Sequence, residues 1–181
     1  MNVTNSIFSQ RGTFSVEFAI VGIFFGLLLI FSSDLVIKLS MKGKLDRLSF
    51  SSVSILKERT QLYGKQTVVS HSQAEQINNI AFSSLKRMNR TVRHERFGVR
   101  VEGMTFSKSG EMNPIATYQF GLTFTPSKPL AELEHLSVLT SWGRRVPLYR
   151  VSVCYQTNNW FGSLIGSNYE LVCSESVMIG R

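Results

Sequence analysis

An uncharged apolar run constrains this chain more than any other feature. Residues 18–33, FAIVGIFFGLLLIFSS, contain no charged side chain. A helix needs roughly 20 predominantly apolar residues to cross a bilayer. The stretch from Phe14 to Ile37 provides that length, although it includes Glu17 and Asp34. Because no second long uncharged run follows, the sequence predicts a single membrane span at about 14–37 and excludes a polytopic membrane protein.

The rest of the chain has the composition of one folded domain. The 181 residues include 13 Phe, 5 Tyr and 2 Trp, which excludes a disordered chain because such a chain lacks apolar surface to bury. This length allows one membrane element and one domain of about 100 to 150 residues. Every Lys and Arg except Arg11 lies at Lys38 or later. The first interpretation is a singly anchored protein whose bulk lies outside the cytoplasm.

Three interpretations compete for the apolar run. A secretory signal peptide would need a small-x-small cleavage site soon after it, but residues 32–35 lead straight into further apolar residues. The second interpretation is an uncleaved anchor, in which Glu17 lies at the cytoplasmic headgroup level. The third is a helix in which Glu17 has a function, because a carboxylate inside a bilayer costs about 2.5 to 3.5 kcal/mol.

The charges that flank the span favour an orientation with the bulk of the chain in the cytoplasm. The segment on the cytoplasmic side of a membrane span usually carries more Lys and Arg than the segment on the other side. The segment before the span carries only Arg11 and the amino terminus. The segment after it carries more basic side chains, partly offset by Asp34 and Asp46: Lys38, Lys42, Lys44 and Arg47. The flanks therefore weakly favour a cytoplasmic position for the bulk of the chain. This conflicts with the interpretation of a singly anchored protein whose bulk lies outside the cytoplasm.

Periodicity predicts two helices followed by strands. Apolar residues at spacings of three and four continue past the membrane exit, which predicts one helix over 13–63 with Gly64 as its C-cap. A second helix should open at Ser72-Gln-Ala-Glu75, a capping-box pattern. Alternating residues then predict strands at 97–102, 118–124, 151–155 and 170–179. The order predicts an α+β domain over 64–181 with four to six strands in an antiparallel sheet, one face of which the long helix covers.

Cys154 and Cys173 are the only cysteines, and both fall in predicted strands. Two thiols alone make a poor metal site. A disulfide is their simplest use in an oxidising compartment, where it would close a loop of about 20 residues and contribute roughly 3 kcal/mol. Two unpaired buried thiols are the alternative.

No catalytic, metal or cofactor motif is present. The three histidines, His71, His94 and His135, stand in no ligand spacing, and glycine-rich phosphate loops are missing. The basic run from Lys86 to Arg100 is interrupted by Glu95 and lacks stacking aromatics, so we expect a solvated helix end and no nucleic-acid partner. The sequence predicts neither an enzyme nor a cofactor.

The residues around Glu17 resemble a known precursor type. Arg11-Gly12-Thr-Phe-Ser-Val-Glu17 places a glycine, four residues, a glutamate and an apolar helix in the order found in type IV pilin precursors. The start of the chain looks like the TadE/TadF group of the tight-adherence (Flp) pilus system. Residues 45–51, LDRLSFS, and 57–63, KERTQLY, look specifically like the TadF branch. Thr13-Phe14 departs from other type IV pilins, which have an aromatic residue directly after the cut.

The resemblance implies a minor pilin or pseudopilin with a pilin-like fold. Residues 1–12 would be a leader removed by a prepilin peptidase, with Gly12 as the cleavage residue, Thr13 as the new terminus and Glu17 as the assembly carboxylate. The implied partners are the membrane, the peptidase, an assembly platform, and other minor and major pilins. The implied location is the bacterial inner membrane and periplasm, with incorporation into the pilus. An uncleaved periplasmic binding or sensor protein, and a membrane-anchored enzyme, are the alternatives.

Overall fold

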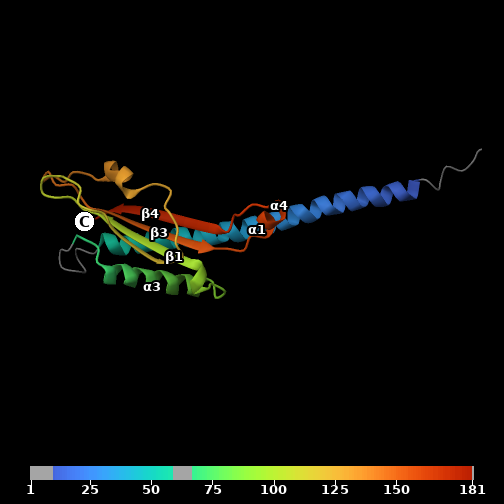
Figure 1. The fold of residues 1–181 in the computed structure, drawn as a ribbon, viewed down its shortest axis with the longest axis horizontal. Coiled ribbons are helices and arrows are strands. Elements are labelled where there is room, and N and C mark those ends of the chain that lie inside the picture. The colour runs from blue at the N-terminus through green and yellow to red at the C-terminus, as the bar shows by residue number, and fades with distance from the viewer. Residues whose placement is uncertain (1–9, 59–66, 181) are drawn as a thin grey trace, which may run out of the picture. The chain divides into compact units, whose positions relative to one another are not determined.

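The computed structural model describes residues 10–58 and 67–180, with side chains from Phe14 onward. Two long helices precede a sheet, and short helices lie between the strands (Figure 1). The elements in chain order are α1 (Gln10–Lys57), α3 (His71–Met88), η2 (His94–Arg96), β1 (Phe97–Met104), β2 (Ala116–Gly121), η3 (Leu130–Leu136), β3 (Leu148–Gln156), α4 (Trp160–Ile165) and β4 (Leu171–Ile179). The predicted α+β fold with a long N-terminal apolar helix and an antiparallel sheet is confirmed.

The described chain forms two compact units. Residues 10–38 of α1 form one unit together with residues 159–169, which include α4. Residues 39–158 and 170–180 form the other, which holds the sheet. The helix α1 ends at Lys57, earlier than the expected 63. The expected end of this helix and its C-cap at Gly64 lie outside the described residues.

The helix α3 begins two residues earlier than the sequence indicated. Ser70 is its N-cap, because its extended backbone (φ −93°, ψ 158°) lets the Ser70 hydroxyl accept a hydrogen bond from the backbone N–H of Gln73. The Gln73 side chain in turn accepts from the Ser70 backbone N–H, which completes a capping box. The prediction of a box at Ser72 and Glu75 was therefore wrong. Both pairs satisfy the pattern in sequence, but Ser70 has the geometry of an N-cap.

Four strands form one antiparallel sheet in the order β2-β1-β3-β4. The two central strands are almost entirely buried along their length. The second strand ends at Gly121, short of the expected residue 124. Gly121 has φ +70°, and a Cβ there would lie 2.2 Å from the carbonyl oxygen of Phe97. This close approach requires glycine, and it ends the strand.

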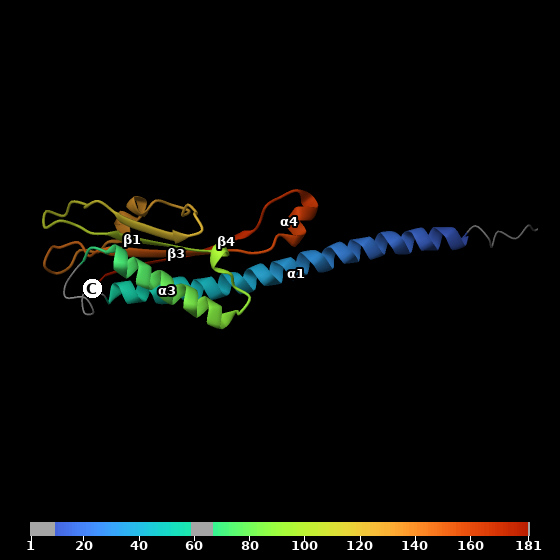
Figure 2. The same ribbon diagram turned by 60° about the horizontal axis from the view of Figure 1, so that its bottom comes forward.

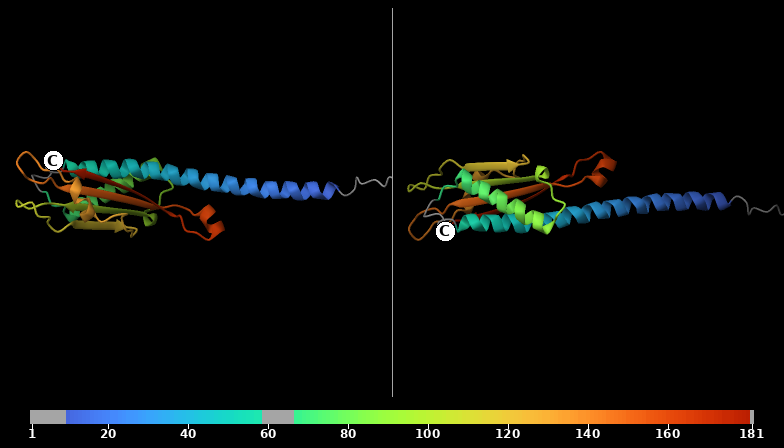
Figure 3. Two further views of the ribbon diagram at one scale, coloured as in Figure 1. Left: turned by 90° about the horizontal axis from the view of Figure 1, so that it is seen from above. Right: turned by 90° about the horizontal axis from the view of Figure 1, so that it is seen from below.

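Alternate residues of the strands face two different layers. Val99, Val101, Val151 and Val153 pack against α3 and the second half of α1 in the main core. Figures 2 and 3 show these two helices on the same face of the sheet. From α1, the core includes Met41, Leu45, Leu48, Val53 and Leu56. The expectation that the long helix covers one face of the sheet is confirmed, although Leu39, an apolar residue of α1 just beyond the expected span, is 61% exposed.

The other face of the sheet is covered by the segment that leads into η3. Leu130 of η3 packs with Met104 and Leu148 in a second, smaller core. Beside this core the same face carries charged side chains from β1, β3 and β4. This face therefore differs from the helix-covered face, whose strand residues are mostly apolar.

Candidate functional site

The first half of α1 exposes apolar side chains on all sides. Phe14, Phe18, Ile23 and Leu29 are each more than 60% exposed. Within the described residues, α1 is the one helix long and apolar enough to cross a membrane, judged by length and composition. Helices that are apolar all round are buried in a protein core or in a membrane. Because the chain itself does not bury this half-helix, it requires an external apolar partner.

Glu17 is an isolated carboxylate in this apolar surface. Phe14 precedes it by three residues and Val21 follows it by four, so these two side chains share its face of the helix. Phe14 and Phe18 stack one turn apart, with ring centroids 6.4 Å from each other. Glu17 is exposed and forms no salt bridge with any described side chain. A carboxylate in such surroundings needs a cationic partner from elsewhere before it can be buried.

Gly12 and Thr13 lie in the backbone of α1, which begins at Gln10. Residues 1–9 of the expected leader lie outside the described residues. Glycine in a helix interior costs about 1 kcal/mol relative to alanine. Gly12 lies in the first turn of α1, whereas Gly22 and Gly26 lie in the interior of the helix, within the apolar run.

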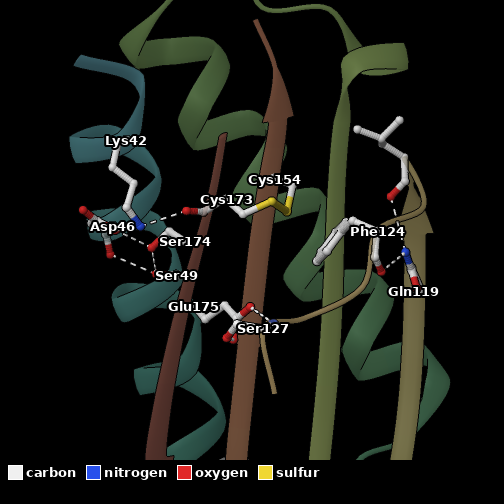
Figure 4. The surroundings of a disulfide bond; sticks show 11 residues. Lys42, Asp46, Ser49, Gln119, Phe124, Ser127, Cys154, Cys173, Ser174 and Glu175 are labelled. Carbon is white, nitrogen blue, oxygen red and sulfur yellow. Dashed lines mark hydrogen bonds and ion pairs between the residues drawn. A yellow bond between two sulfur atoms is a disulfide. The ribbon is translucent and has the colours of Figure 1, made fainter. Parts of the chain in front are cut away.

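A polar cluster attaches α1 to the edge strand β4 (Figure 4). The Lys42 ammonium donates to the Cys173 carbonyl oxygen over 2.8 Å and lies 2.9 Å from the Asp46 carboxylate. The Ser174 hydroxyl donates to Asp46 over 2.5 Å and lies 3.0 Å from the Ser49 hydroxyl. Burial raises the pKa of Asp46, but the hydrogen bond from Ser174 and the charge of Lys42 outweigh it, so the pKa lies below its usual value. Asp46 stays ionised and keeps both partners.

Cys154 and Cys173 form a disulfide between β3 and β4. The two residues are direct cross-strand partners, and they lie on the sheet face opposite the helices. Their separation of 19 residues encloses α4. The bridge therefore joins the edge strand to the central strands at the point where the chain leaves the sheet and returns.

Replacing both cysteines with serine should lower the free energy of unfolding by about 3 kcal/mol, because the unfolded chain regains the entropy of a closed loop of this size. Thermal unfolding of the detergent-solubilised full chain, followed by circular dichroism, measures the loss. The matched control is the unchanged chain treated with a thiol reductant, which should unfold at the same temperature as the double variant. An unfolding temperature that responds to neither treatment would contradict a stabilising role for the bridge.

Sequence reasoning missed a buried ion-pair cluster on the second face of the sheet. Arg150 is 1% exposed, and its Nε and Nη2 lie 2.6 and 2.5 Å from the Glu102 carboxylate. Arg100 approaches Glu102 to 3.2 Å, and Glu175 approaches Arg150 to 3.7 Å. A cavity of about 300 Å³ lies beside Arg100, Glu102 and Arg150. Two arginines and two glutamates balance in charge, so the cluster is an internally paired element of the sheet.

The remaining candidates from the sequence have structural surroundings. His71 contacts the Tyr118 and Phe120 rings edge-on, and His94 contacts Phe82. In the part of the chain that the structure describes, no three His, Cys, Asp or Glu side chains come together to hold a metal ion. The basic run is divided among several elements. Lys86 and Arg87 lie in the last turn of α3, Arg96 donates to the Asn158 side chain, and Arg100 lies in β1 beside Glu102.

The comparison with protein families decides the identity of the chain. The family model of the tight adherence pilin protein F, TadF, matches residues 5–181. The chain belongs to the TadF family. The resemblance of residues 45–51 to TadF has a structural counterpart, because Leu45 and Leu48 enter the core while Asp46 and Ser49 contact β4. TadF is a family of structural pilins and not of enzymes.

Neither the curated proteins nor the solved structures yielded a match to this TadF chain. The family and the apolar helix α1 are together compatible with membrane anchoring and with partners in a pilus.

Proposed function

We propose that this TadF protein is a minor pilin that a prepilin peptidase cuts after Gly12 and that then acts in the assembly or initiation of a tight-adherence pilus. The observation that carries the proposal is Glu17, an exposed carboxylate in an otherwise apolar helical surface with no salt-bridge partner among the described side chains. Membership of the TadF family supports the same function.

The cut creates the cationic partner that Glu17 lacks. Cleavage after Gly12 leaves an α-amine on Thr13, and Glu17 becomes the fifth residue of the product. In a bundle of such helices, the amine of one subunit pairs with Glu17 of its neighbour, and both charges enter the apolar interior neutralised. A buried charge is tolerated only when it is paired. The partial positive charge at the new helix N-terminus favours the same carboxylate.

The disulfide supports a periplasmic position for the sheet domain. Disulfides persist in oxidising compartments such as the bacterial periplasm. We infer that α1 crosses the inner membrane and that residues from about 39 onward lie in the periplasm, despite the weak charge bias in the opposite direction. The prepilin peptidase, the assembly platform and the other pilins are the proposed partners. The proposed function requires no cofactor and no nucleic acid.

The proposal predicts that Gly12→Asp blocks both the cut and fibre assembly. The aspartate places a charged side chain at the position where the peptidase must cleave. Gly43→Asp is the matched control, because Gly43 lies in the same helix beyond the span and a Cβ there meets nothing within 4 Å. A strain that lacks the wild-type gene and carries each variant is examined by electron microscopy for fibres. An uncleaved sensor or binding protein predicts instead that Gly12→Asp changes neither the apparent mass nor the function.

A further inference from the structure

A loop without charge lies between β3 and β4. Residues 159–169, NWFGSLIGSNY, contain no Asp, Glu, Lys or Arg, although the full chain is rich in basic residues. We call this segment the foot. The foot contains α4 and belongs to the same compact unit as residues 10–38 of α1.

The shape of the foot is fixed by its own hydrogen bonds. The Asn159 amide donates to the Ser167 carbonyl oxygen over 2.7 Å, and its Oδ1 accepts from the Tyr169 backbone N–H over 3.3 Å. A Cβ at Gly162 would lie 2.0 Å from that same Oδ1, so the turn closes only around glycine. Gly166 ends α4 in the left-handed region, with φ +70°. The foot is therefore a preformed surface that needs no ordering on binding.

The foot packs against α1 where the apolar run ends. The Phe161 ring meets the Phe31 ring edge-on, with centroids 4.9 Å apart. The Lys38 ammonium lies 5.9 Å from the centre of the Tyr169 ring and 2.5 Å from the Asp34 carboxylate. Asp34 is only 5% exposed. The foot thus lies along the helix between residues 31 and 38.

The position of these contacts along α1 gives their depth in a membrane. A helix rises 1.5 Å per residue, so a hydrocarbon core of about 30 Å corresponds to about 20 residues. A span that begins at Phe14 therefore leaves the hydrocarbon near Asp34. The contacts of the foot bracket this point, which places it at the level of the lipid headgroups.

The outward surface of the foot has the chemistry of that level. Trp160, Leu164, Ile165 and Tyr169 are between 52% and 57% exposed. Trp and Tyr are enriched at membrane–water interfaces, because their rings are apolar and carry one polar atom. Single exposed apolar residues are ordinary on a soluble surface, but a contiguous group marks an interaction site.

We propose that the foot is a second membrane contact, which inserts Trp160 and its apolar neighbours into the lipid interface beside the end of the span. The proposal rests on the single-span anchoring in the proposed function. Continuity with the apolar half-helix and the absence of charge favour lipid as the occupant. The foot then covers the Asp34–Lys38 pair and limits the tilt and rotation of α1 before assembly.

The chain offers a direct probe, since it contains two tryptophans. Trp142→Phe leaves Trp160 as the single tryptophan, and Trp160→Phe leaves Trp142, which is 87% exposed and lies in the other unit. Each full-length variant is reconstituted at high lipid excess into phosphatidylethanolamine–phosphatidylglycerol vesicles, with or without bromine on the acyl chains near the headgroup. We expect brominated lipid to quench Trp160 and leave Trp142 unquenched. Acrylamide in the aqueous phase should quench Trp142 more strongly than Trp160. Leu164→Asp should abolish the lipid quenching of Trp160 while the protein still floats with the vesicles.

The possible outcomes separate the inference from the function on which it rests. Flotation with vesicles together with acrylamide-accessible Trp160 would overturn the foot but leave the anchor intact. If brominated lipid quenches Trp160 at low protein density and this quenching is lost at high protein density, the result supports the foot as a contact made before assembly. Protection of Trp160 from acrylamide only at high protein density, without quenching by lipid, would assign this surface to a neighbouring subunit and overturn the lipid contact. Failure to float would contradict the anchor and the foot together.

Discussion

Glu17→Leu should abolish incorporation of this TadF protein into fibres while the protein remains in the membrane. In the proposed bundle, the substitution leaves the Thr13 amine of a cleaved neighbour without its carboxylate in an apolar interior. Breaking one partner from a buried pair costs about 3 to 5 kcal/mol, which corresponds to a loss of assembled subunit of roughly a hundredfold or more. Leucine also removes the cost of inserting a carboxylate, about 2.5 to 3.5 kcal/mol, so membrane anchoring should not weaken. Immunoblots of sheared fibres and of membranes measure the two effects separately.

Two further variants isolate the charge of Glu17. Glu17→Gln keeps the shape of the side chain and should fail in assembly as Glu17→Leu does. Val16→Leu is an apolar exchange at the adjacent exposed position and should assemble normally. If Glu17 only marks the headgroup level of an uncleaved anchor, Glu17→Leu should leave the function unchanged. Normal fibre content in the Glu17→Leu strain would therefore exclude the pairing role.

Glu102→Leu should destabilise the sheet domain by about 3 to 5 kcal/mol, because it leaves the Arg150 guanidinium buried without its main counter-ion. The remaining acidic neighbour of Arg150 is Glu175, at 3.7 Å. For a domain of this size, the loss corresponds to a drop in unfolding temperature on the order of 10 to 20 °C. Thermal unfolding of the detergent-solubilised full chain, followed by circular dichroism, measures it.

The chain contains a matched control for Glu102. Glu134 also forms an ion pair with an arginine, Arg145, but its side chain is 41% exposed. The same substitution there, Glu134→Leu, should cost about 1 kcal/mol or less, since exposed pairs contribute little. The double variant Glu102→Leu, Arg150→Met should recover most of the lost stability, because apolar replacements of both partners avoid an unpaired charge. Equal losses for Glu102→Leu and Glu134→Leu would contradict the account of a buried cluster.

The apolar run, the long helix and the strand-rich second half followed from the sequence because they depend on local periodicity. The helical stripe was also predictable where it consists of Leu45 and Leu48, which enter the core. The exact cap of α3 was not, because two overlapping capping patterns occur within six residues and only the backbone at Ser70 decides between them. The early end of β2 likewise depends on the approach of Gly121 to Phe97, which no local pattern reveals.

Contacts between residues far apart in the sequence could not be predicted without the register of the sheet. Glu102 and Arg150 are 48 positions apart and become direct partners only when β1 pairs with β3. In the sequence, Glu102 ended an alternating apolar segment and Arg150 preceded another, so neither side chain suggested burial. The same holds for Asp46 and Ser174, which are 128 positions apart. Alternation indicates which residues share a face, but the pairing of strands decides which charges meet.

The contact between the foot and α1 also could not be predicted from the sequence. Trp160 and Phe161 were visible in the sequence as aromatic residues between two cysteines. Their relation to the span depends on the contact between Phe161 and Phe31, which are 130 positions apart in the chain. The absence of charge in residues 159–169 is a sequence signal that could have indicated a membrane contact.

The first residue of the mature protein tests the central claim most directly. Cleavage after Gly12 removes 12 of the 181 residues and leaves a product of 169 residues that begins at Thr13. The measurement is the intact mass of the protein purified from membranes of cells that contain the peptidase, together with the sequence of its N-terminal peptide. The account predicts a terminus at Thr13. A membrane form that still begins at Met1 or Asn2 would contradict it.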